Sequence, residues 1–227
     1  MVIDMTSLKM FLKKEKKNLI ISLAAAVIVS LAFTVIVSLK TYADNIQSGI
    51  AEKIVRLHIV ANSNSDFDQD LKLKVRDGVL DFMRDKMKEC KSREESIKVL
   101  EESKDEIKAK AESIIFENNC YYSVNVSFEK TLFPVKSYDG ITLPSGMYDA
   151  VRIDIGEAKG QNWWCVMYPS LCIYGSENET DSTAQEELKN ILSNEEYSVI
   201  ADRDGINFKF AAVEAVKKVE TSFNGID

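Results

Sequence analysis

Few side chains in this sequence could act as a nucleophile or as a general base. The 227 residues include one histidine, His58, and four cysteines. A cysteine nucleophile needs a base within hydrogen-bond reach, so a catalytic pair would have to join His58 to a cysteine such as Cys165. Cys165 lies in a segment with the alternation of a strand, where a packed thiol or a disulfide is the common role. We therefore predict no catalytic residue and no enzyme activity.

A run of carboxylates offers a second kind of chemistry. Asp66, Asp68 and Asp70 follow a polar loop, and a pair of carboxylates can cleave glycosidic bonds. The alternative function is therefore an exported, cell-wall-active hydrolase that uses this acidic cluster. The same residues also stand at the start of a predicted helix, where carboxylates complement the positive end of the helix dipole. We favour this structural role.

The sequence contains no motif for a cofactor, a metal or nucleic acid. It lacks the glycine-rich patterns that bind phosphates, and no cysteine or histidine spacing fits a zinc site. The net charge of -7 divides unevenly, because residues 1–43 carry +4 and the remaining residues carry -11. An acidic domain repels phosphate backbones, so nucleic acid is not expected as a partner.

The N-terminal segment has the pattern of a membrane-inserting helix. Residues 18–39 carry no charge and follow a lysine-rich stretch. About 20 apolar residues suffice to cross a bilayer, and a lysine-rich flank stays in the cytoplasm, so the rest of the chain is exported. A signal peptidase could cut after Ala43, although the apolar run is longer than in ordinary signal peptides. We expect residues 1–43 to be a signal peptide or a signal anchor, and residues 44–227 to form an extracytoplasmic domain.

Four cysteines lie in the exported part: Cys90, Cys120, Cys165 and Cys172. Disulfides form in oxidising places outside the cytoplasm. Cys165 and Cys172 are close enough in sequence to meet across a hairpin that turns near Pro169, so a disulfide between them is one interpretation. Four buried thiols are the other.

The elements that hold these residues follow from the hydrophobic pattern. Residues 53–60 alternate apolar and polar side chains, which favours a half-buried strand. After a polar loop, a helix begins at Asp66 with Ser65 as its N-cap. A second helix begins near Ser92, and the Asn118–Asn119 pair ends it.

The second half of the domain is predicted to supply most of the sheet. Three further strands are expected over residues 122–129, 148–155 and 162–168. The last two flank a short loop with a glycine at each end, so we expect them to pair antiparallel as a hairpin. After a polar loop over residues 175–183, two helices over residues 183–192 and 208–223 complete the chain. The fold class is α+β, with an antiparallel sheet packed by helices and preceded by the N-terminal membrane-spanning or signal helix.

Two consecutive tryptophans stand in the last predicted strand. Alternation sends Trp163 and Trp164 to opposite faces of the sheet, so that one can fill the core. The other is either covered by a helix or left exposed, where it would anchor a partner.

Several separate blocks of this sequence resemble the stage II sporulation protein R family. They are residues 55–65 (VRLHIVANSNS), Asp68–Gln69, residues 71–77 (LKLKVRD), residues 143–146 (LPSG) and residues 160–166 (GQNWWCV). An export segment precedes these blocks, as in that family. Agreement over several blocks is more specific than any one motif.

The resemblance implies a signalling protein of endospore-forming bacteria, with residues 44–227 as its extracytoplasmic signalling domain. Such a protein is exported across the forespore membrane into the intermembrane space, where it is secreted or membrane-anchored. There it activates a membrane-embedded aspartic protease, the stage II sporulation protein GA, so that pro-sigma-E is processed in the mother cell. The expected partners are this receptor and the membrane. The candidate partner-binding residues are His58, Asn62, Ser63, Asp66, Asn162, Trp163 and Trp164.

Overall fold

The computed structural model describes residues 5–138, 140–174 and 181–201. The chain divides into two compact units, Met1–Asp44 and Asn45–Asp227. The first unit consists of most of one helix, and the second contains every strand of the described residues.

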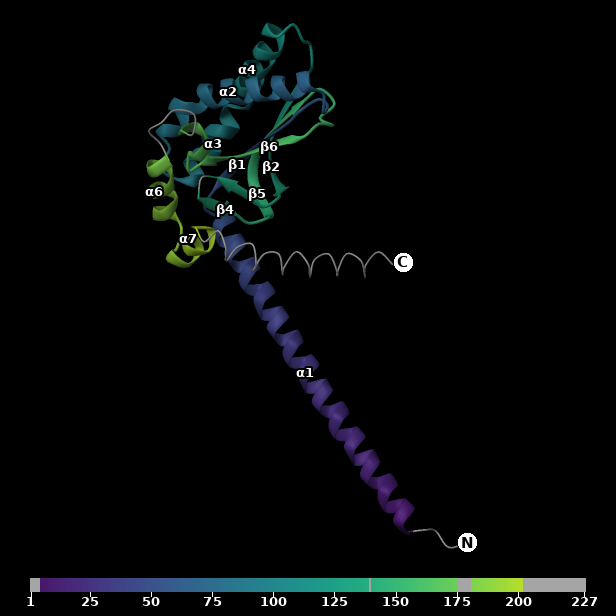
Figure 1. Ribbon diagram of the computed structural model, residues 1–227. Coiled ribbons are helices and arrows are strands. Elements are labelled where there is room, and N and C mark those ends of the chain that lie inside the picture. Colours follow the sequence, from purple (N-terminus) through teal and green to yellow (C-terminus); the bar gives the residue numbers. More distant parts are fainter. Residues whose placement is uncertain (1–4, 139, 175–180, 202–227) are drawn as a thin grey trace. The chain divides into compact units, whose positions relative to one another are not determined.

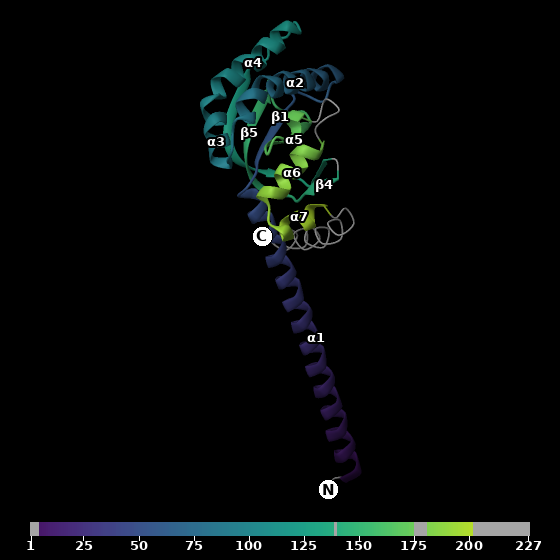
Figure 2. The same ribbon diagram turned by 90° about the vertical axis from the view of Figure 1, so that its left-hand side faces the viewer.

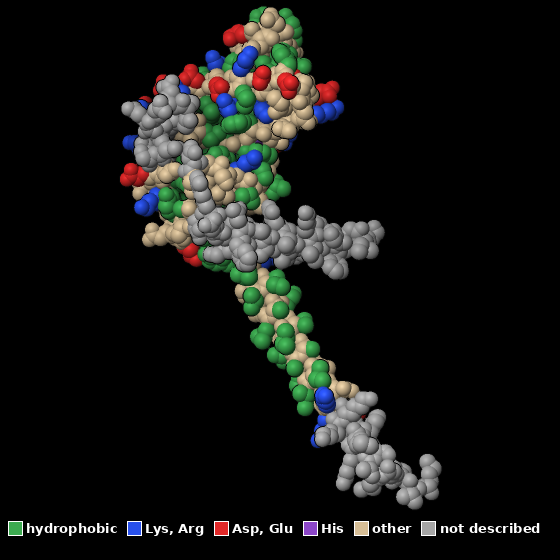
Figure 3. All heavy atoms as spheres, viewed as in Figure 1, with side chains coloured by type: hydrophobic (Ala, Val, Ile, Leu, Met, Phe, Trp, Pro, Cys, Tyr) green, Lys and Arg blue, Asp and Glu red, His purple; other side chains and the backbone are tan. Residues whose placement is uncertain are grey.

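The N-terminal helix α1 runs from Met5 to Ala51. Its stretch from Glu15 to Ala51 is the only helix in the described part of the chain that is long and apolar enough to cross a membrane. Between Leu19 and Leu39 its large apolar side chains are exposed, and Figure 3 shows them along the helix. Bare apolar surface of this length is typical of a membrane or signal helix, which confirms the predicted N-terminal element.

A four-stranded sheet forms the centre of the second unit. Its strands are β1 (Val55–Val60), β2 (Val124–Phe133), β5 (Gly146–Ile155) and β6 (Asn162–Tyr168), in the order β2-β5-β1-β6. β1 pairs parallel with β5, whereas the β1–β6 and β2–β5 pairs are antiparallel. The short strands β3 (Lys136–Tyr138) and β4 (Ile141–Leu143) form a separate antiparallel pair. The sheet is therefore mixed rather than wholly antiparallel.

The prediction that β5 and β6 pair as a hairpin is wrong. These two strands run in opposite directions but do not pair, because β1 lies between them. Two strand spacings are about 10 Å, which the six residues 156–161 can span. The short loop therefore passes over the end of β1 instead of making a tight turn.

Helices α2 (Asp66–Lys88), α3 (Arg93–Glu102) and α4 (Lys104–Glu117) cover one face of the sheet (Figure 1, Figure 2). Ser65 caps α2 as predicted, because its hydroxyl accepts a hydrogen bond from Asp68 N. The single helix expected from Ser92 is instead two helices separated at Ser103. The predicted end at Asn118–Asn119 is confirmed, and Asn119 has a φ of 56°, as is common after a helix C-terminus.

The core lies between these helices and the sheet. Apolar side chains alternate along the strands and recur along one side of each helix, so both sets meet in one layer. The most buried members are Val55, Leu57, Ile59, Leu71, Val75, Met83, Leu100, Ile107, Val151 and Ile153. This arrangement confirms the α+β class with a sheet packed by helices.

Three short helices follow the sheet: α5 (Leu171–Tyr174), α6 (Asp181–Ile191) and α7 (Asn194–Ala201). α6 confirms the helix predicted over residues 183–192. Its start at Asp181 shortens the predicted polar loop, whose residues 175–180 lie outside the described part of the chain. The helix predicted over residues 208–223 also lies outside the described residues.

The sheet has two distinct ends. The loop end carries the loops 61–65, 118–123 and 156–161. The root end consists of residues 45–54, β3, β4 and α7, and it lies opposite the C-terminal tip of α4 (Figure 1, Figure 2). At the root end, the Ile46, Ile50 and Ile54 side chains are buried.

Polar contacts fix the root end as well. Lys53 Nζ lies 2.5 Å from the Glu196 carboxylate, and an added Cβ on Gly49 would come within 2.2 Å of Glu196 Oε1. Gln47 Nε2 donates to Met147 O at 3.2 Å. The last turns of α1 therefore belong to the fold of the second unit.

Candidate functional site

Two of the predicted motif loops interlock at the loop end. Gly160 N donates to Ala61 O at 2.9 Å, and Lys159 N donates to Asn62 O at 3.1 Å. Gln161 N donates to the Asn64 side chain at 2.8 Å. These bonds tie the loop after β5 to the loop after β1, which explains how the β5–β6 connection is held over the end of β1.

The side chains of Asn62 and Ser63 complete this contact. Asn62 Oδ1 accepts from Glu157 N at 2.9 Å, and Asn62 Nδ2 donates to Asp68 Oδ2 at 2.9 Å. Ser63 Oγ donates to the same carboxylate oxygen at 2.5 Å. Burial of Asp68 raises its pKa, but hydrogen bonds from Ser63, Asn62 and other neighbours outweigh burial, so the pKa is lowered. The two predicted site residues therefore hold the loops in place through a buried carboxylate.

Gly160 is required by the closeness of the two loops. A Cβ on Gly160 would lie 2.2 Å from Ser63 O, a backbone atom. A Cβ on Gly156 would lie 2.3 Å from Asn62 Oδ1, and Gly156 has a φ of 58°. Only glycine fits both positions without movement of the opposite loop.

The third loop joins the same structure. Gly156 N donates to Ser123 O at 2.9 Å, which connects the loop after α4 to the loop after β5. All three loops thus form one continuous surface at the loop end. Asp66 lies beside it, exposed in the first turn of α2.

Trp163 and Trp164 lie on opposite faces of the sheet, as predicted from strand alternation. The Arg76 guanidinium of α2 lies 4.2 Å from the Trp163 ring centroid, on the helix-covered face. Trp164 stacks on His58, with ring centroids 5.0 Å apart, on the other face. Both indoles are half-buried, so each combines a packing role with some accessible surface.

His58 is buried beneath Trp164. Its Nδ1 donates to Asn162 Oδ1 over 3.3 Å. Burial lowers the pKa of His58, and Arg152 adds to this effect, whereas Asn162 and the nearby carboxylates oppose it. The imidazole is therefore neutral at pH 7 and is joined to two of the other predicted site residues.

The structure does not bring His58 and Cys165 together as a catalytic pair. Neighbouring residues of β6 alternate between the faces, and Cys165 lies with the helix-covered core while His58 faces Trp164. The Cys165 sulfur is also bonded to Cys172. A disulfide sulfur is not a thiolate nucleophile.

The acidic cluster does not form a shared catalytic site either. Asp66 and Asp70 are exposed, whereas Asp68 is buried and accepts the hydrogen bonds described above. The structural role of a first helical turn accounts for all three. Among the residues that the structure describes, no group of three or more His, Cys, Asp or Glu side chains could hold a metal ion.

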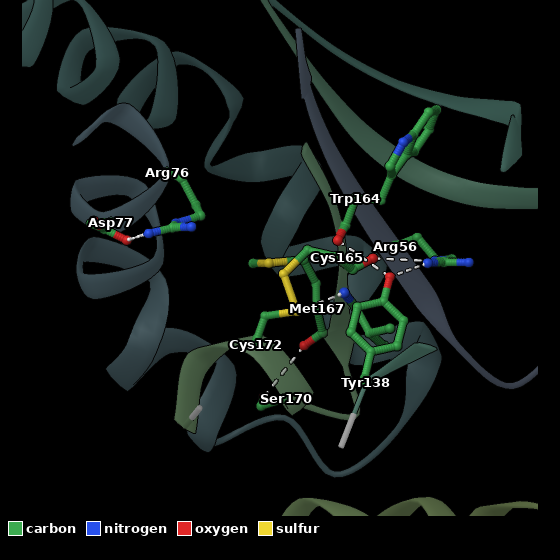
Figure 4. Close-up of a disulfide and its surroundings, with 10 residues drawn as sticks. Arg56, Arg76, Asp77, Tyr138, Trp164, Cys165, Met167, Ser170 and Cys172 are labelled. Atoms are coloured by element: carbon green, nitrogen blue, oxygen red, sulfur yellow. Dashed lines mark hydrogen bonds and ion pairs between the residues drawn. A yellow bond between two sulfur atoms is a disulfide. The ribbon is translucent and has the colours of Figure 1, made fainter. Parts of the chain in front are cut away.

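A disulfide joins Cys165 of β6 to Cys172, with Cα atoms 6.1 Å apart (Figure 4). The prediction that this disulfide joins the two strands of a hairpin is wrong, because Cys172 lies in the short helix α5 and not on a strand. Val166 N donates to Cys172 Sγ at 3.1 Å, so the helix also contacts the backbone of β6. Cys90 and Cys120 are free thiols.

The sequence that forms the loop end is similar to that of known proteins. Residues 51–179 match the family described as stage II sporulation protein R. The chain belongs to this family. A relative, the stage II sporulation protein R of Bacillus subtilis (strain 168), is 38% identical over 138 residues. This match covers 61% of the chain and 62% of the relative, so the chain matches less than two thirds of the relative's length. No solved structure matches.

The stage II sporulation protein R match confirms the predicted resemblance and makes this a sporulation protein. It begins at Ala51, where α1 ends, and includes all four strands of the sheet and all three loops of the loop end. Gly160 belongs to one of the predicted blocks, but its fit against Ser63 depends on two loops almost 100 residues apart and was not predicted.

Proposed function

We propose that this protein is an exported signal of endospore formation that activates a membrane-embedded aspartic protease, the stage II sporulation protein GA. The activated protease then processes pro-sigma-E in the mother cell. The chain would act as a ligand, and it would shift the receptor toward its active arrangement by binding that arrangement more tightly. No chemistry by the chain itself is needed for this role.

The observation that carries the proposal is the extent of the family match. It covers the whole sheet together with the three interlocked loops, and two of the predicted blocks, residues 55–65 and 160–166, include parts of two of these loops. The N-terminal helix supports the topology, because a lysine-rich flank followed by an apolar span exports what comes after it. The domain would then work in the space between the forespore and the mother cell.

The proposed receptor contact is the loop end with the adjoining part of β6. Asp66 is exposed there, and Asn162, Trp163 and Trp164 keep partly accessible surface. Asn62, Ser63 and His58 support these residues from inside through the contacts described above. Loops fixed by a rigid sheet are typical of binding surfaces.

The proposal is tested with a sigma-E-dependent reporter in a sporulating strain that lacks this gene. The strain is complemented with the native chain or with residues 44–227 alone, which would stay in the cytoplasm. We expect the native chain to restore the reporter and the cytoplasmic form to leave it inactive. Equal activity of both forms, or an active reporter without the gene, would contradict a signal that acts across a membrane.

A further inference from the structure

The strand β2 forms one edge of the four-stranded sheet. It pairs with β5 over its whole length, Val124–Phe133, without a register shift. On its other side, no strand of the described residues pairs with it. At the opposite edge, β6 is contacted by α5, because Val166 N donates to Cys172 Sγ. β2 is therefore a long and regular edge, and such an edge is a template for another strand.

The pairing shows which backbone groups of β2 point away from the sheet. Gly156 N donates to Ser123 O, so Ser123 and every second residue after it bond toward β5. The residues between them direct both the N–H and the C=O outward: Val124, Val126, Phe128, Lys130 and Leu132. This edge thus offers a row of donors and acceptors with the spacing that an antiparallel strand requires.

The sequence of β2 fits a second copy of itself. Outward-pointing residues must face each other, so an antiparallel pair of identical strands has one residue at its centre. The two registers with the greatest overlap are centred on Phe128 and on Glu129. A centre at Glu129 places two carboxylates opposite each other, which is destabilising. A centre at Phe128 places two aromatic rings opposite each other and brings no like charges together.

Exposed apolar side chains stand at both ends of β2. Phe116 and Tyr121 precede the strand and are 64% and 84% exposed, whereas Leu132 and its β5 partner Met147 at the other end are 62% and 47% exposed. In an antiparallel pair the start of one strand meets the end of the other. Leu132 then lies opposite Val124 of the second copy, next to the loop that carries Tyr121. Two-fold pairing brings the two apolar ends together, which favours a second copy over an unrelated strand.

The charges along this edge do not select a partner of either sign. β2 carries one carboxylate and one lysine. Glu129 lies 3.6 Å from Arg152, and Lys130 stands opposite Asp149 of β5. Near the start of β2, two lysines also have partners within the chain: Lys108 with Glu112, and Lys74 with Asn118. Two copies of this edge can therefore approach without charge repulsion between the strands.

We propose that the chain forms a homodimer through β2, in which the two strands pair antiparallel around Phe128 and the two sheets become one. The same surface then serves both copies, as in a two-fold symmetric interface. This inference does not rest on the proposed function. The strand β6, which is part of the proposed receptor contact, lies at the opposite edge of the sheet and stays free in the dimer.

Single cysteines test the register in the detergent-solubilised full chain, with the free thiols removed by Cys90→Ser/Cys120→Ser. Phe128→Cys places two thiols opposite each other, so mild oxidation should link the chains into dimers on a non-reducing gel. Leu132→Cys is the control: this side chain is more exposed than Phe128, but in this register it lies roughly 25 Å from its copy. It should give no linked dimer. Absence of linkage at Phe128→Cys, or equal linkage at Leu132→Cys, overturns the inference.

A second test does not need a cysteine at the centre and applies if Phe128→Cys fails to fold. Lys130→Pro removes an outward N–H and leaves the bonds to β5 in place, since an edge strand accepts proline where its N–H faces outward. In sedimentation of the full chain, Lys130→Pro should dimerise at least about tenfold more weakly than the control Lys130→Ala. A monomeric native chain contradicts the homodimer. Equal dimer affinity of the two variants assigns the contact to α1 or another surface and also overturns the inference.

Discussion

At the loop end, hydrogen bonds join three loops edge to edge, whereas at the root end a buried guanidinium lies among aromatic rings. Arg56 is fully buried, and its guanidinium carbon lies 4.1 Å from the Phe133 ring centroid and 5.1 Å from that of Tyr148. Its Nη2 donates to the Tyr138 hydroxyl, and its Nε donates to Cys165 O at 3.2 Å (Figure 4). The loop end is thus held by many backbone hydrogen bonds, whereas Arg56 adds one large buried side chain to the apolar and polar contacts of the root end.

Burial is the main cause of the pKa shifts of Arg56 and Tyr148 at the root end. It lowers the pKa of Arg56, although Tyr138 and Tyr148 counteract this effect. It also raises the pKa of Tyr148 to about 12. Both tyrosines therefore stay neutral, and within the described residues the cation is held by stacking and hydrogen bonds rather than by a carboxylate. The comparison teaches that the loop end is stabilised by hydrogen bonds between loops, whereas the Arg56 side chain is stabilised by aromatic packing and burial.

The largest expected effect comes from removing the central side chain of the root end. Arg56→Ala leaves a cavity beneath Phe133 and Tyr138, so we expect a loss of about 4 kcal/mol in the free energy of unfolding. The measurement is urea unfolding of the detergent-solubilised chain, followed by the fluorescence of Trp163 and Trp164. Arg56→Met fills most of the volume and should lose clearly less. A cost below about 1 kcal/mol for Arg56→Ala would contradict the central role of this residue.

The second effect tests the tight fit at the loop end. Gly160→Ala places a methyl group against the Ser63 carbonyl, so we expect the free energy of unfolding to fall by about 3 kcal/mol. Lys159→Ala, the exposed neighbour, is the control and should change stability by less than about 0.5 kcal/mol. Equal unfolding midpoints for the two variants would show that the loops can separate without cost.

The third effect concerns the link between β6 and α5. Cys172→Ser removes the disulfide, which closes a short loop, and the expected loss is about 2 kcal/mol. Adding a reductant to the native chain should give the same unfolding midpoint as the variant. If the reductant has no effect on the native chain while the variant is destabilised, the cost comes from packing of the sulfur and not from the bond.

The smallest effect appears only when the pH changes. Because the folded pKa of His58 is lowered below its ordinary value of 6.5, the unfolded chain takes up a proton more readily than the folded chain. The contribution of His58 to stability is therefore complete above pH 6.5 and is lost as the pH falls through the folded pKa. His58→Gln should remove this part of the pH dependence. If the free energy of unfolding falls equally for the native chain and for His58→Gln between pH 7 and pH 5, this role of His58 is refuted.

Much of the fold follows from local sequence patterns. The cap at Ser65, the helix end at Asn118–Asn119 and the opposite directions of the tryptophans were predicted, because each depends on residues a few positions apart. The pairing of β5 and β6 was predicted wrongly, since the insertion of β1 depends on contacts across the whole domain. The pattern of neighbouring residues in the sequence does not predict which strand lies between two others.

The candidate site was predictable to a similar extent. The blocks around Asn62 and Trp163 were found from the sequence, but their internal hydrogen bonds were not. Arg56 was expected on a half-buried strand, yet it is completely buried. The rings that cover it come from Phe133, Tyr138 and Tyr148, which are distant in sequence.

The contact between α5 and β6 has a consequence for the edge of the sheet. β6 is an edge strand, and such strands expose unpaired backbone groups to which another chain can add. Here the Val166 amide is occupied by the Cys172 sulfur, and the disulfide holds the helix at that position. With the Cys165–Cys172 disulfide formed, the chain blocks part of its own open edge, so fewer unpaired backbone groups of β6 are left for another chain to join.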